Sequence, residues 1–584
     1  MTQDPSGYDA LHTRSACLEF ARPVITPTIR SLVRGAVEAS WARAIATGTL
    51  PELPADVGRP TVEVERPADP IHGDFASNLA MKVARPYRMA PLAIASALAD
   101  ALSREIERDP AGTPIAAADA AAPGFLNLRL ADHALESAIA GVVAAPDAWG
   151  RVAPIRPRSV NVEFVSANPT GPLHIGNARG AFVGDLLCRV LEAGGQQVTR
   201  EYYFNDVGGQ IPNLGASIAA IRRGDAVPDD GYHGDYVHEL AANVTDDRWA
   251  EATAPGADTN GILGHWAALR VREGIERSLA SLGVRFDVWT TEASLHAGGW
   301  VDRAIERLRA QGNVYEQDGA LWFRSTAFGD DKDRVIIRSN GEPTYFAADI
   351  GYVTEKFSRG FDHLIYVWGS DHHGTVARVR NAAQAMGYDP DAVQMLLYSW
   401  VRFVRDGVEV SMSKRAGDFI TLDELLGEIG VDSARWFFAS RSVNTGIDFD
   451  IELAKKQSNE NPVYYVQYAH ARIASILRKA SEAGLKPADN VAGWLTEEPE
   501  AALARAVVRF PEVIEDAVAA EETHGITAYA TELATTFHAF YRDARVVDAG
   551  APERSAARLA LADATRVTLA NGLGLLGISA PESM

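Results

Sequence analysis

The segment VNVEFVSANPTGPLHIGNARG, at residues 160–180, limits the possible folds more than any other part of the chain. The run VNVEFV has the character of a buried strand, the prolines and glycine after it predict a stiff turn, and a helix is expected from His174 to about Ala193. A second strand-like run, VTREYYF at 198–204, follows that helix. This order predicts a parallel sheet with helices on its faces, and in such sheets ligands bind beyond the carboxyl ends of the strands.

The same alternation continues to about residue 450 and divides the chain into three zones. Strand-like HLIYVWG (363–369), a helix through 376–387 and strand-like MLLYSWVRFV (395–404) extend the pattern, so we assign residues 151–450 to one α/β domain with an insertion at about 206–295. Residues 1–150 combine helical segments, an alanine-rich tract at 115–124 that is expected to carry a turn, and strand-like FLNLRL (125–130), which predicts a small α+β domain. Residues 451–584 are rich in alanine, leucine and arginine and predict an all-α bundle.

Composition narrows the class of protein further. The chain has no apolar run of about 18 residues, no secretory signal, and only two cysteines, Cys17 and Cys188, in no CxxC pattern. We therefore expect a cytoplasmic protein with no transmembrane helix and no zinc site. The net charge of −21 argues only weakly against a nucleic-acid partner, because phosphate contacts need a local basic track rather than a basic protein.

The turn at 169–177 has the features of a nucleotide site. His174 is expected near a helix N-terminus, where free N–H groups and the helix dipole suit phosphate. The histidine and Asn177 can donate hydrogen bonds to phosphate oxygens, and Gly176 would let an adenine ring approach the backbone. The alternative for these residues alone is a stiff turn with a capping histidine.

Two later segments strengthen the nucleotide prediction. SMSKRAG (411–417) supplies Met412, Ser413 and Lys414 on a glycine-containing loop, and the lysine could reach a pyrophosphate as negative charge builds on it. WGSDHHG (368–374) follows a strand directly. Its Asp371 could accept hydrogen bonds from ribose hydroxyls, and Gly369 leaves room for the sugar or base. His372 is also predicted to bind ATP. Adjacent histidines are a weak metal signal, so we predict no metal site in the protein.

These three motifs, in this order, resemble the class I aminoacyl-tRNA synthetases, and the resemblance is closest to the arginyl-tRNA synthetases. It runs almost end to end through EFVSANPTGPLHIGNARG, REYYFNDVGGQ, LGVRFDVW, DGALWFRSTAFGDDKDRVIIRSNGEPTYFAADIGY, MSKRAG, NPVYYVQYAHARI and LGISAPESM. The resemblance implies a Rossmann-like catalytic domain that uses ATP, with Mg²⁺, to form an aminoacyl-adenylate, with His174 and Lys414 as the catalytic residues. Two positions depart from the family pattern: Asn177 replaces a second histidine, and Ser411 replaces a lysine.

The resemblance also implies an arginine pocket. A guanidinium needs carboxylates that accept bidentate hydrogen bonds. By motif position, Glu163 and Asn168 are expected to hold the α-amino and carboxylate end. Asp349 and Glu292 are expected near the guanidinium, and Tyr345 would share a helix face with Asp349. His373 is also predicted to bind arginine. The alternatives are an exposed helix carboxylate for Asp349 and an edge-strand charge for Glu163.

The stretch QSNENPVYYVQYAHARIASILRKA (457–480) is expected to bind tRNA. Tyr464, Tyr468, His470 and Arg472 recur at helical spacing, and aromatic and guanidinium planes suit unstacked bases. The alternative is an amphipathic helix whose tyrosines pack in the bundle core. The resemblance makes 451–584 the anticodon-binding domain and 1–150 a domain that touches the outer corner of the tRNA.

The sequence therefore predicts a monomeric arginine–tRNA ligase whose partners are ATP, L-arginine and an arginine-accepting tRNA. Two alternatives stay open: a ligase of the same fold that makes a small-molecule amide, and a non-catalytic tRNA-binding paralogue. The helical C-terminal zone argues against the first, and the retention of His174 and Lys414 argues against the second. A nicotinamide dehydrogenase is a poorer alternative, because no GxGxxG motif follows the first strand of the sheet.

Overall fold

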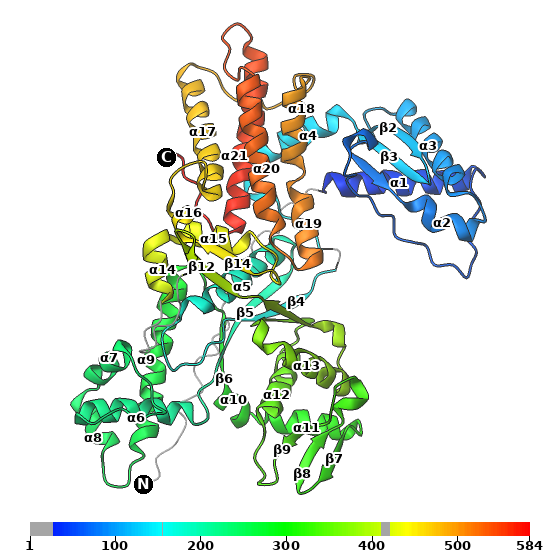
Figure 1. Cartoon of the computed structure of the whole chain (residues 1–584). Coiled ribbons are helices and arrows are strands. Elements are labelled where there is room, and N and C mark those ends of the chain that lie inside the picture. Colours follow the sequence, from blue (N-terminus) through cyan, green and yellow to red (C-terminus); the bar gives the residue numbers. More distant parts are fainter. Residues whose placement is uncertain (1–26, 155, 410–420) are drawn as a thin grey trace, which may run out of the picture.

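A five-stranded parallel sheet forms the centre of the molecule (Figure 1). The computed structural model describes residues 27–154, 156–409 and 421–584. The strand order is β11-β10-β4-β5-β6, and each neighbouring pair is parallel. The bounds are β4 Ser159–Phe164, β5 Gln197–Phe204, β6 Val288–Thr291, β10 His363–Gly369 and β11 Val393–Tyr398. The predicted α/β architecture is confirmed.

Helices cover both faces of this sheet. In β10, Ile365 and Val367 pack into one core with α5 (Ile175–Ala193). Leu364 and Tyr366 pack into another core with α12 (Tyr345–Ser358) and α13 (His373–Ala385). Successive side chains of a strand point to opposite faces, so a strand buried on both sides reads as a continuous apolar run.

Two units extend from the sheet. Between β5 and β6 lie α6 Gln210–Arg223, α7 Asp235–Asn243, α8 Asp246–Ala252 and α9 Thr259–Ser281, which share a small core of their own. The expected insertion at 206–295 thus also contains β6, which rejoins the sheet as an edge strand, and the start of α10 (Glu292–Ala297). The second unit precedes α12 and contains α11 Trp300–Ala310 and an antiparallel sheet of β7 Val314–Gln317, β8 Ala320–Phe323 and β9 Arg334–Ile337.

One local prediction is wrong and one is incomplete. The run at 395–404 is two strands: β11 ends at Tyr398, and β12 (Val401–Arg405) pairs with β13 (Val408–Glu409) and β14 (Ile447–Asp450) in a different sheet. The break follows from the buried Arg179, whose Nη1 donates to the carbonyls of Ser399 and Trp400. The alanine-rich tract carries the expected turn, at residues 122–124, but its first part forms a strand that was not predicted, β2 (Ile115–Ala121), because its pairing with β3 and its packing outweigh the low strand propensity of alanine.

The remaining elements form an N-terminal unit and a C-terminal bundle. The N-terminal elements are α1 Ile29–Ala46, β1 Phe75–Ser77, α2 Leu79–Tyr87, α3 Pro91–Arg108, β3 Phe125–Leu130 and α4 Asp132–Ala144, with sheet order β1-β3-β2. Helices α14 Leu422–Ile429 and α15 Val431–Ala439 still pack on the core of the central sheet, and the C-terminal elements are α16 Ile451–Lys455, α17 Pro462–Glu482, α18 Glu498–Val508, α19 Phe510–Ala520, α20 Gly525–Asp543 and α21 Pro552–Leu575. The all-α character predicted for the C-terminal zone is confirmed.

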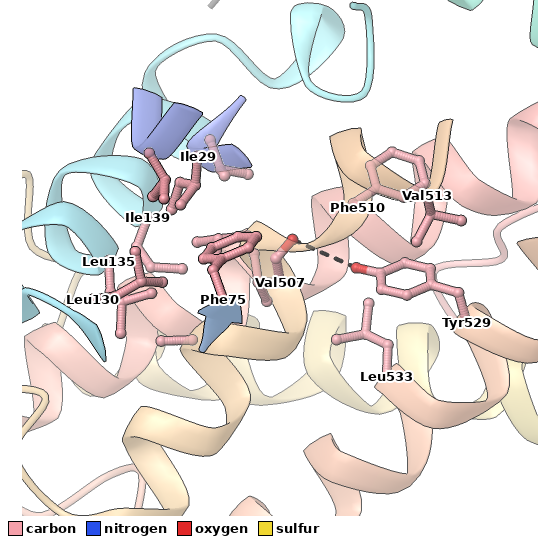
Figure 2. Close-up of a cluster of buried hydrophobic side chains, with 14 of the residues drawn as sticks. Ile29, Phe75, Leu130, Leu135, Ile139, Val507, Phe510, Val513, Tyr529 and Leu533 are labelled. Carbon is pink, nitrogen blue, oxygen red and sulfur yellow. Dashed lines mark hydrogen bonds between the residues drawn. The ribbon is translucent and has the colours of Figure 1, made fainter. Parts of the chain in front are cut away.

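One apolar core joins the N-terminal unit to the bundle. Figure 2 shows Ile29 of α1 and Ile139 of α4 on the side of the N-terminal unit, with Val507 of α18 and Phe510 of α19 on the side of the bundle. We retain the division at about 150 and 450 as a proposal for the domain boundaries. None of the helices in the part of the chain that the structure describes has the length and hydropathy to cross a bilayer.

Candidate active site

A cavity of about 920 Å³ opens at the carboxyl ends of β4, β5, β10 and β11. This is the edge at which α/β sheets bind ligands, and the volume suits a small-molecule site. The predicted site residues that line it are Glu163, Asn168, His174, Gly176, Asn177, Asp349, Gly369 and Asp371. The structure therefore brings together residues from motifs that lie far apart in the sequence.

His174 is the N-cap of α5 and enters the cavity as a neutral donor. Its Nδ1 accepts from the Gly176 amide at 3.1 Å, and its own amide donates to Asn177 Oδ1 at 3.2 Å. Because Nδ1 accepts, the ring proton of the neutral imidazole lies on Nε2. The surrounding protein lowers the pKa of His174 by desolvation, which favours this neutral form. The capping role and the phosphate-donor role are therefore compatible.

Gly176 is required for the histidine ring rather than only for a ligand. A Cβ at this position would lie 2.9 Å from both Cε1 and Nδ1 of His174. Any side chain here would displace the imidazole from its bond to the helix N-terminus.

The described chain resumes at Thr421, a few residues after the second nucleotide motif, and contacts this turn. Met412, Ser413 and Lys414, together with Ser411, lie outside the described residues. The chain that follows them forms a β-bridge from Thr421 to His174, and the Leu422 amide donates to the Leu173 carbonyl at 3.1 Å. The backbone at Thr421 and Leu422 is therefore joined to the turn that holds His174.

Gly369 and Asp371, the residues expected to lie near the ribose, line the cavity at the end of β10. A Cβ on Gly369 would lie 2.4 Å from Asp371 Oδ1, so glycine is needed where the strand turns into the short helix at Ser370–His372. Tyr398 lines the cavity beside them, and its pKa is raised by burial and by the Asp371 carboxylate. The side chains of His372 and His373 are not among those described.

Three carboxylates gather on the other side of the cavity. Glu163 ends β4 and is 3% exposed, Asp349 lies on α12, and Glu292 opens α10 and is 5% exposed. Burial, with the charges of Glu163 and Glu292, raises the pKa of Asp349 to about 7. Burial and the same three carboxylates also raise the pKa of Tyr203, which lines the cavity between them.

In the part of the chain that the structure describes, one of the three carboxylates has a lysine or arginine partner. Lys356 Nζ donates to Glu163 Oε2 at 2.6 Å. Among the described residues, Asp349 and Glu292 form no ion pair with lysine or arginine; the imidazole of His296 lies 3.7 Å from Glu292. Unpaired buried carboxylates are costly, so this wall favours a ligand that brings positive charge.

The backbone that follows Glu163 at the end of β4 is strained. Val165 and Ser166 have φ values of 66° and 40°, in the left-handed region that branched residues avoid. Ser166 Oγ donates to Glu163 Oε1 at 3.2 Å and accepts from the Tyr203 amide at 3.0 Å. These hydrogen bonds therefore hold the strained backbone in place and also orient the Glu163 side chain.

Two residues expected on this side do not line the cavity. Tyr345, the first residue of α12, is 69% exposed, because the first helical turn projects beyond the rim. Glu292 is buried behind Tyr203 rather than on the cavity surface. Asn168 lines the cavity from the turn after β4, as expected from its motif.

Sequence reasoning missed several residues here. Tyr352 and Lys356 follow Asp349 at helical spacings of three and seven residues on α12, a signal that was present in the sequence. Tyr366 on β10 lines the cavity, and its buried hydroxyl has no hydrogen-bond partner among the described residues. No local pattern marks Tyr366 or Tyr203, because their place depends on which strands are neighbours.

The residues expected to bind RNA separate into two groups. Tyr468 and Arg472 of α17 line a groove of about 470 Å³ against α20, with Tyr465, His538, Tyr541 and Arg542. The Arg472 guanidinium lies over the Tyr541 ring at 4.5 Å. His470 is instead 1% exposed and its Nδ1 bonds to the Pro581 carbonyl at 2.9 Å, so it fastens the C-terminal segment. Tyr464 is half-buried and outside the groove.

Three family models match consecutive parts of the chain. The arginyl tRNA synthetase N terminal domain matches residues 30–130, the class I (R) tRNA synthetase catalytic domain matches 147–228 and 266–445, and the DALR anticodon binding domain matches 466–584. The gap in the catalytic match, 229–265, falls within the helical unit between β5 and β6.

Solved structures agree with these matches. A putative arginyl-tRNA synthetase from Campylobacter jejuni is 32% identical, with a TM-score of 0.71 over 78% of this chain and 100% of that chain. The Thermus thermophilus arginyl-tRNA synthetase is 24% identical (TM-score 0.71; 94% of this chain, 100% of that chain). The Plasmodium falciparum enzyme is 16% identical (TM-score 0.71; 96% and 100%). The last two show the shared fold.

The three matched models follow one another along the chain, from the N-terminal domain through the catalytic domain to the anticodon binding domain. The chain belongs to the arginyl-tRNA synthetase family.

Proposed function

We propose that Asp349 and Glu292 supply the negative charge that binds arginine in the cavity. The observation that carries this proposal is that neither carboxylate has a lysine or arginine partner within residues 27–154, 156–409 and 421–584, while Glu163 has one. Three acids and one buried lysine leave a net charge of −2 at this wall once Asp349 is ionised, and arginine brings two positive groups, the guanidinium and the α-ammonium. Tyr366, with its free buried hydroxyl, is a further donor for the ligand.

The protein is an arginine–tRNA ligase. It activates L-arginine with ATP to arginyl-adenylate and pyrophosphate, and then transfers arginine to the 3′ end of its tRNA. Glu163 and Asn168 are proposed to orient the α-amino and carboxylate end, since each oxygen of an ionised carboxylate can accept more than one hydrogen bond. This orientation would direct the substrate carboxylate toward the α-phosphate of ATP.

The nucleotide is proposed to lie between the His174 turn and the Gly369–Asp371 wall. The Nε2 proton of His174 and the N-terminus of α5 would donate to phosphate oxygens, and Lys414 would meet the departing pyrophosphate. No group of three or more His, Cys, Asp or Glu side chains suited to a metal ion occurs in the described chain. Mg²⁺ would therefore arrive on the ATP phosphates, held through one or two carboxylates, of which Asp371 is the nearest candidate.

For the tRNA, we propose that the groove between α17 and α20 receives an unstacked anticodon-loop base. Aromatic faces and guanidinium planes stack on bases of any sequence, and Tyr468 and Arg472 present both. The N-terminal unit would contact the outer corner of the tRNA. We further propose that the protein acts as a cytoplasmic monomer and forms the adenylate only with tRNA bound.

The decisive experiment is aminoacylation of total tRNA with each of the twenty amino acids, in the wild type and in Asp349→Asn. The proposal requires charging with arginine alone and a large rise in the arginine KM in the variant. Charging with another amino acid, or an unchanged arginine KM in Asp349→Asn, would refute the pocket. Pyrophosphate exchange with and without tRNA tests the tRNA requirement, and Lys414→Ala separates an enzyme from a binding paralogue, which would be indifferent to it.

A further inference from the structure

Lys356 is a fully buried cation directly behind the acidic wall. Its side chain is 0% exposed, and its ammonium donates to Glu163 at 2.6 Å. The same ammonium lies over the rings of Tyr352 and Tyr366, 4.2 and 4.0 Å from their centroids. One carboxylate and two aromatic faces therefore surround this buried ammonium group.

The pairing occupies Glu163 as well. One carboxylate oxygen accepts from Lys356 and the other from Ser166. The charge of Glu163 is therefore compensated inside the protein before any substrate arrives. Asp349 and Glu292 have no such compensation from lysine or arginine in the described chain.

We infer that Lys356 is a positioning residue that sets the charge offered to the substrate: by neutralising Glu163, it leaves two carboxylates to be balanced by the two positive groups of arginine. This inference rests on the proposed function of the pocket. Lys356 acts through Glu163 and through the electrostatic environment of Asp349.

The ionisation of Asp349 provides the measurement, and it depends on the charged and titratable groups around this residue. They are Glu163 on β4, Tyr203 on β5, Glu292 at the start of α10, Tyr352 and Lys356 on α12, and Tyr366 on β10. Glu201 on β5 faces the same lysine: it pairs with Arg359 at 2.6 Å and accepts from the Tyr352 hydroxyl at 2.6 Å, and although burial opposes it, the charges of Lys356 and Arg359 lower the pKa of Glu201.

Binding of arginine should therefore follow the ionisation of Asp349. Its pKa of about 7 means that the carboxyl is largely protonated at pH 6 and ionised at pH 8. Only the ionised form attracts a guanidinium, so the arginine KM of the wild type should fall between pH 6 and 8 and then level off. Without Lys356, the uncompensated charge of Glu163 would move this midpoint to higher pH.

The test compares the pH dependence of the arginine KM and the ATP KM, at saturating tRNA, in the wild type and variants. In Lys356→Met, which keeps a long apolar stem against the two rings, the midpoint should rise by about one unit, which is about a five- to sixfold higher arginine KM at pH 7, because the ionised fraction of Asp349 falls from about one half to about one eleventh. The ATP KM should change less than about threefold. In Glu163→Gln the charge left behind is that of Lys356, so the midpoint should fall.

The double variant Glu163→Gln/Lys356→Met leaves neither charge and should return the midpoint to the wild-type value, a non-additivity that marks a direct coupling. If Lys356→Met does not fold, Glu163→Gln and the double variant still give the two opposing predictions. Midpoints that stay at the wild-type value in all three variants, or equal rises of the arginine and ATP KM, would overturn the inference.

Arg359→Met is the matched control. It removes a cation from the same helix beside a buried glutamate, but Glu201 does not line the cavity. It should lower the melting temperature and leave the midpoint unchanged, and a shifted midpoint would count against Lys356. Asp349→Asn separates the two proposals. If this variant leaves the arginine KM unchanged, the proposed pocket is wrong. If it raises the arginine KM strongly but the midpoint does not move in the Lys356 variants, only the inference about Lys356 is overturned.

Discussion

Gly176 shows how a single missing side chain fixes the chemistry of its neighbour. The His174 ring folds back onto the helix N-terminus, and a methyl group on Gly176 would occupy the same space, 2.9 Å from two ring atoms. The imidazole would have to leave its bond to the Gly176 amide. It would then lose both the tautomer and the direction that suit a phosphate oxygen.

Gly176→Ala should therefore raise the ATP KM and spare the arginine KM. Forcing a methyl group into a filled space costs about 1–3 kcal/mol, or roughly ten- to a hundredfold in KM if the whole cost falls on the nucleotide complex. Aminoacylation kinetics with each substrate varied in turn give the measurement. Gly35→Ala in α1, where no atom lies within 4 Å of the added group, is the control and should be neutral. An equal rise in both KM values would contradict this account.

At the residue scale, the sequence predicted which charged residues belong to the site better than it predicted which groups they contact. Glu163 and Asp349 stand in motifs, and both line the cavity as expected. Tyr345 shares helical spacing with Asp349, but periodicity says nothing about where the helix begins relative to the rim. Lys356 shows the reverse case: its spacing was visible, but its role depends on the carboxylate of a strand almost 200 residues earlier.

At the scale of elements, the apolar pattern predicted the central sheet well, because each strand buried on both faces is a compact apolar run. It predicted less where side chains from other elements intervene, as at the break between β11 and β12 made by Arg179. Sheet β7-β8-β9 was missed because its strands are four residues each and partly exposed. In α17, periodicity indicated a buried face but could not say that His470 belongs to it.

The packing of α17 against α20 predicts which tyrosine contacts RNA. Tyr468→Ala removes one aromatic wall of the groove and should weaken tRNA binding by about 1–3 kcal/mol, the range for a lost base stack. Fluorescence anisotropy with a labelled tRNA, at one fixed salt concentration, provides the affinity. Tyr464→Phe, on the same helix outside the groove, should bind as the wild type does. A normal affinity in Tyr468→Ala would show that the groove is not part of the RNA surface.

At the scale of the whole molecule, the N-terminal unit and the bundle are packed as one body. Their apolar side chains form a single core across α1, α4, α18 and α19 (Figure 2). Charged groups reinforce this contact at its edge. Arg66 donates from Nε and Nη2 to the two oxygens of Glu512 at 2.7 and 3.0 Å, and its guanidinium lies over the Phe75 ring at 4.4 Å. If the two ends of the chain bind distant parts of one tRNA, this junction sets the distance between them.

Arg66→Met tests whether that distance matters. It leaves Glu512, whose side chain is 1% exposed, with only Arg30 at 3.8 Å, and breaking a buried pair in this way costs about 3–5 kcal/mol. Hydrogen exchange should therefore speed up in α1, β1 and β3, and tRNA affinity should fall while the ATP KM stays constant, because neither Arg66 nor Glu512 lines the cavity. Arg402→Met, which breaks the exposed pair with Asp448, should change neither. Faster exchange with an unchanged tRNA affinity would mean that the N-terminal unit is held by the bundle for stability alone, and the tRNA-contacting role proposed for it would then be wrong.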